Sequence, residues 1–190
     1  MAVYNTSARN HVWLAWFVLQ VPIIVLIDGL DYFFPSSMYE PAGAPLHFAY
    51  NIKQDYVATY NDPIGQWSPE TASGHDSWMG LFLYLEFAFI LPAVLYAVFQ
   101  LGVMRRGTSG ATELLLLLYG FETALTTLVC IHDVAYWDPA AYSPEVKRTL
   151  TFQLFGPWFA IPFLMSIDMA CRILARFKAA DAVLASKKGQ

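Results

Sequence analysis

The chain has 190 residues, of which 57% are hydrophobic, 16% aromatic and only 14% charged, and its mean hydropathy is +0.42. An ordinary soluble domain carries about a quarter charged residues, so the composition favours an integral membrane protein. The formal net charge of −4 argues against a nucleic-acid partner held by a basic surface. The aromatic content and eleven prolines argue against a coiled coil or a disordered chain.

Four apolar runs are long enough to cross a bilayer, which takes roughly 20 residues in a helix. They cover about residues 12–30, 78–103, 114–134 and 152–171. We therefore predict an all-α fold, an integral membrane four-helix bundle that forms one domain over residues 1–190. Residues 31–77 form its long connection and residues 172–190 its tail. Cys130 and Cys171 lie inside the runs, so a disulfide framework is not expected.

The basic residues predict an orientation in the membrane. Four spans leave both termini on one side, and most of the eleven basic residues belong to that side, namely Arg9, Arg105, Arg106, Arg172, Arg176, Lys178, Lys187 and Lys188. The positive-inside bias makes this side cytoplasmic. The long connection of residues 31–77 is then lumenal or extracellular.

That connection is too long to be a structureless loop in a compact domain. Apolar residues between Leu46 and Tyr60 recur at near-helical spacing, and Asn61-Asp62-Pro63 ends the pattern. We predict a short amphipathic helix that forms a lid over the mouth of the bundle. A helix lying in the lipid headgroups is an equally good interpretation of the composition.

Four acids fall within the predicted spans, where an unpaired carboxylate costs several kcal/mol. They are Asp28, Glu86, Glu122 and Asp168. Asp28 and Glu86 lie at similar depth from the same end of their spans. Asp168 precedes Arg172 by one helical turn and is interpreted as a snorkelling or paired surface acid.

A polar stripe on the third span is predicted to face the bundle interior. Tyr119, Glu122, Thr126 and Asp133 share one helix face. Glu122 could equally serve helix packing through a hydrogen bond, and Asp133 could lie at the membrane interface. Trp158, inside the fourth span, is predicted to line a cavity.

The sequence lacks the spacing of a metal site, a phosphate-binding loop or a nucleophile elbow, so no metal or cofactor is expected. Carboxyl groups in an aromatic-lined apolar cavity could protonate an alkene and remove a proton elsewhere, and a tryptophan face could stabilise the carbocation between the two steps. The same groups could instead bind an amine or a hydroxyl-bearing lipid. The residue types alone leave both chemistries open.

Five motifs in order along the chain carry a resemblance to a known family. They are I-V-L-I-D-G-L at 24–30, D-Y-V-A-T-Y-N-D-P at 55–63, L-Y-L-E-F-A-F-I-L-P at 83–92, L-L-Y-G-F-E-T-A-L-T-T-L at 117–128 and W-F-A-I-P-F-L-M-S-I-D at 158–168. Together they resemble the emopamil-binding protein (EXPERA) superfamily, a four-span module shared by the sterol double-bond isomerase and the sigma-2 receptor.

The resemblance implies roles for individual residues. Asp28 matches a ligand-site aspartate of the receptor, Glu86 an acid that is catalytic in the isomerase, Asp62 an aspartate of the lid, and Trp158 a tryptophan implicated in carbocation stabilisation. Glu122 stands where the receptor has a histidine.

A second departure concerns the isomerase, which has a histidine at the position of Ile24. The resemblance also implies a homodimer. The final Lys187-Lys188-Gly-Gln resembles a dilysine retrieval signal of endoplasmic-reticulum membrane proteins, and a solvated basic tail is the alternative.

The leading functional hypothesis is a membrane enzyme that isomerises or cyclises a terpenoid or sterol-like substrate by general acid/base proton transfer. Its predicted catalytic residues are Asp28, Glu86 and Glu122, and its predicted substrate-binding residues are Trp158, Tyr119, Asp62, Tyr56, Thr126 and Asp133. The alternative is a non-catalytic sterol- or lipid-binding and trafficking protein. A third reading is a structural assembly factor whose acids pair with another subunit.

Overall fold

The computed structural model describes residues 5–69 and 77–188, and this part of the chain forms helices and no β-strand. The first half contains α1 (Arg9–Ile23), α2 (Leu30–Phe33), α3 (His47–Tyr60), α4 (Ser77–Leu85) and α5 (Leu91–Val98). The second half contains α6 (Gly110–Tyr136), α7 (Pro144–Thr149) and α8 (Gly156–Lys188). Residues 70–76 of the predicted long connection lie outside the described residues.

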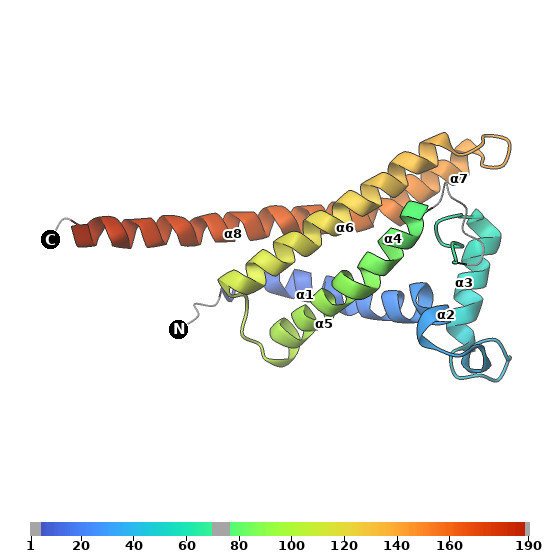
Figure 1. Ribbon diagram of the computed structural model, residues 1–190, viewed down its shortest axis with the longest axis horizontal. Helices are drawn as coiled ribbons and strands as arrows, with labels where there is room; N and C mark the ends of the chain where they lie inside the picture. The colour runs from blue at the N-terminus through green and yellow to red at the C-terminus, as the bar shows by residue number, and fades with distance from the viewer. Residues whose placement is uncertain (1–4, 70–76, 189–190) are drawn as a thin grey trace.

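Four helices are long and apolar enough to cross a membrane, which confirms the predicted all-α membrane fold. They are Arg9–Asp28, Ser77–Val103, Gly110–Tyr136 and Pro144–Lys187. The fourth differs from the prediction, because α8 continues past Cys171 through the expected tail and projects alone from the bundle (Figure 1). Residues 172–188 contain neither proline nor glycine and are rich in alanine, leucine and lysine, which are good helix formers.

The two ends of the chain lie at the same end of the bundle, here called the terminal end, and α3 crosses the opposite end, here called the lid end (Figure 1). Helices α6 and α8 pack side by side along the bundle. Their closest approach is at Gly120, where an added Cβ would lie 2.6 Å from the carbonyl oxygen of Pro162. The four spans enclose a core that includes Phe17, Leu116 and Met165.

Helical segments of π type interrupt three of the spans, at Ile24–Asp28, Glu86–Ile90, Phe99–Val103 and Leu150–Phe155. Pro22, Pro92 and Pro157 each lie within two residues of one of these segments. A proline removes one backbone donor, and a π turn shifts the hydrogen-bonding register around such a gap. Wider turns of this kind re-aim side chains, and they are common at functional sites.

The predicted lid helix is confirmed as α3. It ends at Asn61, whose positive φ of 48° begins the turn that Asp62 and Pro63 continue. Asparagine adopts this left-handed conformation more easily than most residues. Because Tyr56 and Asp62 both line the cavity described below, the structure favours a lid over a helix in the headgroups.

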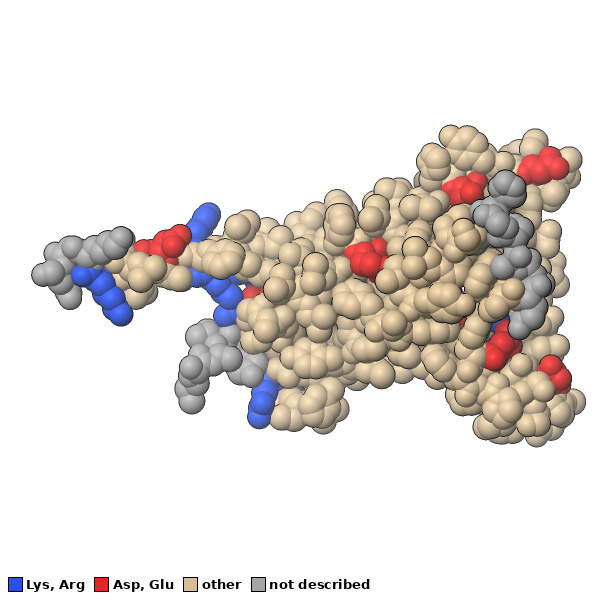
Figure 2. All heavy atoms as spheres, in the orientation of Figure 1, with Lys and Arg blue, Asp and Glu red and all other residues tan. Residues whose placement is uncertain are grey.

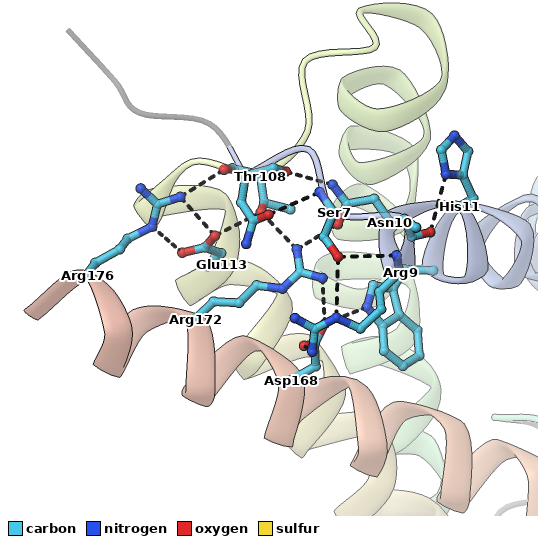
Figure 3. A network of polar contacts seen from close by, with 12 residues as sticks. Ser7, Arg9, Asn10, His11, Thr108, Glu113, Asp168, Arg172 and Arg176 are labelled. Atoms are coloured by element: carbon cyan, nitrogen blue, oxygen red, sulfur yellow. Dashed lines mark hydrogen bonds and ion pairs between the residues drawn. The ribbon is translucent and has the colours of Figure 1, made fainter. Parts of the chain in front are cut away.

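A buried polar network closes the terminal end (Figure 3). Asp168 accepts hydrogen bonds from Arg172 at 2.6 Å and from the Trp13 indole at 2.9 Å, and it also pairs with Arg9. Asp168 is only 7% exposed, so the predicted pairing with Arg172 is correct but the predicted surface position is wrong. The physical reason is that Arg9 and Trp13 of α1 lie against Asp168 and donate to its carboxylate.

The same network ties the loop before α6 to α8. Arg176 donates to Glu113 at 2.5 Å and to the backbone oxygen of Thr108 at 3.0 Å, and Arg172 donates to Asn10 at 2.6 Å. Glu113 is fully buried, and its charge is met by Arg176 and by the Thr108 hydroxyl at 2.8 Å. Every acid of the network therefore has ionic and hydrogen-bonding partners.

Candidate functional site

A cavity of about 570 Å³ lies between the four spans and the lid. This volume is typical of small-molecule sites, which range over about 300–1,000 Å³. All four spans and the residues around α3 contribute to its wall, which is mainly apolar and aromatic and includes Trp16, Ile23, Phe82, Leu83 and Trp158. The cavity is therefore suited to the body of a hydrophobic ligand.

The structure brings the three predicted catalytic acids together in the wall of this cavity. Asp28 ends the π segment of the first span, Glu86 begins that of the second, and Glu122 lies midway along α6. Glu86 lies within electrostatic reach of both other acids. The π segments thus place two acids from separate spans around one apolar space.

These acids differ from those of the terminal end because they have no protein partners. In the part of the chain that the structure describes, no ion pair or hydrogen bond engages the carboxyl groups of Asp28, Glu86 or Glu122, and one oxygen of Glu122 is fully buried without a donor. Glu113, by contrast, is matched by Arg176. An uncompensated acid in a membrane protein is costly unless a ligand or a cavity satisfies it.

Two of the predicted substrate-binding residues line the cavity from α6 and α8. Trp158 packs its ring against that of Trp16, with centroids 4.8 Å apart, and together they form an aromatic corner. Thr126 lines the cavity, while its hydroxyl donates to the Glu122 backbone oxygen at 3.0 Å. The Thr126 hydroxyl is therefore already engaged by the backbone of its own helix.

Two other residues of the predicted stripe lie outside the cavity wall. Tyr119 is completely buried behind it, where its hydroxyl donates to Gln20 at 2.5 Å and accepts from the Trp16 indole at 2.9 Å. Asp133 accepts a hydrogen bond from Trp137 at 2.7 Å near the end of α6. Eleven residues of helix separate Asp133 from Glu122, about 16 Å along the axis, so the shared face extends beyond the cavity.

The lid contributes Tyr56 and Asp62. Asp62 is 1% exposed and accepts hydrogen bonds from the Tyr56 hydroxyl at 2.6 Å and from the Ile64 backbone amide at 2.8 Å. Burial raises the pKa of the Asp62 carboxyl, although these hydrogen bonds act against the shift. Burial, with the adjacent Asp62 charge, raises the pKa of Tyr56. By accepting these two hydrogen bonds, Asp62 fixes the turn after α3.

Several cavity residues were missed by the sequence analysis. Gln20 is 1% exposed and supports Tyr119, while Lys53 and Trp67 line the cavity from the lid side. A glutamine within the first apolar run is a signal of the same kind as the acids of the spans. Among the described residues, no group of three histidine, cysteine or acidic side chains is arranged to hold a metal ion.

Comparison with known proteins agrees with this architecture. The family model for EXPERA, the expanded EBP superfamily, matches residues 48–169, so the chain belongs to this family of membrane proteins. A curated relative from Saccharomyces cerevisiae, the "Efficient mitochondria targeting-associated protein 19", is 29% identical over 134 residues, which cover 69% of this chain and 73% of the relative.

Proposed function

The chain is a member of the EXPERA family, and we propose that it binds a hydrophobic sterol-like or terpenoid amphiphile. The ligand would occupy the cavity between the four spans and the lid. The observation that carries the proposal is the set of three acids in the wall of a mainly apolar space, Asp28, Glu86 and Glu122, whose carboxyl groups form no ion pair or hydrogen bond among the described residues. The apolar body of the ligand contacts the aromatic corner of Trp16 and Trp158. Its hydroxyl or amine group donates to the acids.

Binding is placed before catalysis for two reasons. Ile24, which stands where the isomerase branch has a histidine, is buried in the core at 1% exposure and does not line the cavity. This chain therefore has no polar side chain at position 24 that could take the place of the histidine. The name of the yeast relative, moreover, refers to mitochondrial targeting and to no reaction.

Proton transfer is the second candidate function, and the location of Trp158 in the same cavity as the acids favours it. In this scheme a protonated carboxyl group of Glu86 or Asp28 donates its proton to a ligand alkene. The carbocation faces the Trp158 ring, and a carboxylate removes a proton from a neighbouring carbon, which restores the acid set. Glu122 positions the ligand.

The proposed location follows the distribution of basic residues and the dilysine pattern, and the proposed assembly follows the family resemblance. We place the chain in the endoplasmic-reticulum membrane with its termini in the cytosol and with Lys187-Lys188 acting as a retrieval signal. Gly189 and Gln190 of that signal lie outside the described residues. A homodimer stays a prediction.

Binding of tritiated cholesterol to the full chain in lipid nanodiscs tests the first candidate. Replacement Glu86→Gln keeps the shape of the side chain and removes the charge, and we expect it to weaken binding about tenfold, the loss typical of one hydrogen bond to a charged group. Glu145→Gln is the matched control, because Glu145 is exposed on α7. Equal binding by all three proteins would contradict the proposed role of the acids.

Incubation in D₂O separates the two candidates. Deuterium bound to carbon in a new sterol or terpenoid product, absent with Asp28→Asn and Glu86→Gln, establishes proton transfer. Ligand that binds and is recovered unlabelled establishes a binding protein.

A further inference from the structure

A second, polar cleft of about 450 Å³ opens at the lid end, and we call it the vestibule. Its wall includes the polar side chains of Asp31, Lys53, Gln54 and Gln66 and the aromatic rings of Tyr32 and Trp67. The cavity of the proposed function is mainly apolar, so the two spaces differ in chemistry.

The two spaces are contiguous. Tyr32, Lys53, Gly65 and Trp67 belong to the walls of both. At the junction Gly65 has no side chain, and an added Cβ would come within 3.2 Å of the Tyr56 ring. A ligand whose body occupies the cavity can therefore extend its polar end into the vestibule.

The charges of the vestibule are balanced within it. The Lys53 ammonium pairs with Asp31 at 2.5 Å, and the other polar side chains of the wall, the amides of Gln54 and Gln66 among them, are uncharged. Lys53 also attracts Asp28, but the three acids of the adjoining cavity outnumber this one ammonium group, so an anionic head group near them would be repelled. The vestibule thus favours an uncharged head group with many hydrogen-bonding atoms.

Trp67 supports the same conclusion. Its indole nitrogen is buried and donates no hydrogen bond in the part of the chain that the structure describes. A buried donor without an acceptor is costly, and a ligand oxygen at the junction would satisfy it. The indole face also offers a flat apolar surface, which suits the C–H face of a sugar ring.

From this geometry we propose that the vestibule is a head-group subsite for an amphiphile with an uncharged, hydroxyl-rich head, such as a hexose joined to a sterol-like body. The inference rests on the proposed function, because it assigns the cavity to the apolar body. It adds the chemical class of the polar end, with Gln54 as a direct hydrogen-bonding partner and Trp67 as both donor and stacking surface.

The test compares tritiated cholesterol with tritiated cholesteryl β-glucoside, each bound to the full chain in nanodiscs. We expect the glucoside to bind about tenfold more tightly. Gln54→Leu should weaken glucoside binding about fivefold, the loss of about one hydrogen bond, and leave cholesterol binding unchanged. Asn51→Leu is the matched control, because Asn51 is exposed one turn earlier on α3 and lies outside both walls.

The outcomes separate this inference from the proposed function. If cholesterol binds and the glucoside binds no more tightly, the subsite is overturned and the cavity proposal stands. The same holds if the glucoside binds more tightly but Gln54→Leu does not reduce its affinity. Failure of both probes to bind overturns the proposed function and the subsite with it. A gain that is lost in Gln54→Leu and kept in Asn51→Leu supports both.

Discussion

Asp62 at the lid end and Glu113 at the terminal end are both buried and both surrounded by donors, whereas the acids of the cavity between them are not. Paired acids hold loops against helices, and unpaired acids face the space a ligand would fill. The difference between structural and ligand-facing acids is therefore visible in their partners, although all of them look alike as letters in the sequence.

The Tyr56 hydroxyl provides a test of this difference in the lid. Tyr56→Phe removes the donor at 2.6 Å from Asp62, so the ionised carboxylate loses a charge-assisted hydrogen bond. We expect the free energy of unfolding to fall by about 1.5–3 kcal/mol at pH 8. Thermal unfolding of the purified chain measures it.

The loss should depend on pH with a definite sign. Burial raises the pKa of Asp62, and removing the Tyr56 donor raises it further, so the mutant binds a proton more readily than the wild type. The destabilisation is largest where Asp62 is ionised and shrinks as the pH falls. Tyr60→Phe is the control on the same helix. A destabilisation that is equal at pH 8 and pH 5 would contradict this role of Asp62.

The residue types of the site could be predicted, but their contacts could not. Asp28, Glu86, Glu122 and Trp158 were identified because acids and tryptophans inside apolar runs are conspicuous. The place of Tyr119 behind the wall depends on how α1 packs against α6, which no spacing within α6 reveals.

At the scale of helices, the sequence predicted the existence of each span and the end of the lid helix, since both depend on local patterns. The π segments were not predicted, although Pro22, Pro92 and Pro157 lie close to them in the sequence. A π turn depends on how neighbouring helices satisfy the freed backbone groups. The depth and direction of Asp28 and Glu86 therefore came from the structure.

The packing of α6 against α8 gives an element-scale prediction. At Gly120 an added methyl group would meet the Pro162 carbonyl oxygen at 2.6 Å, a backbone atom that cannot turn aside. We expect Gly120→Ala to lower the free energy of unfolding by about 1–3 kcal/mol, as overpacking does. Thermal unfolding in detergent measures it.

Gly110 provides the control on the same helix. A Cβ there would lie 3.7 Å from the Arg176 side chain, an ordinary contact. Gly110→Ala should leave stability unchanged or raise it by up to about 1 kcal/mol. If the two replacements have equal effects, close approach is not what requires glycine at position 120.

At the scale of the whole molecule, the chain is asymmetric from end to end. Most of the lysine and arginine side chains visible in Figure 2 gather toward the terminal end, whereas the lid and the vestibule lie at the opposite end and the cavity runs from the lid into the bundle. The buried network of Asp168, Arg172 and Glu113 closes the terminal end. The cavity therefore lies next to the lid and away from this network.

This asymmetry predicts the orientation of the chain, because basic residues stay on the cytoplasmic side. In a chain whose two cysteines are replaced by alanine, Gly43→Cys and Ser186→Cys place single thiols at exposed positions at opposite ends of the bundle. A membrane-impermeant maleimide should label Ser186→Cys in sealed, cytoplasmic-side-out microsomes. It should label Gly43→Cys only after permeabilisation, because the predicted orientation puts the lid end in the lumen. The reverse pattern would put the termini in the lumen, and labelling of both thiols before permeabilisation would contradict the three membrane crossings that separate residue 43 from residue 186.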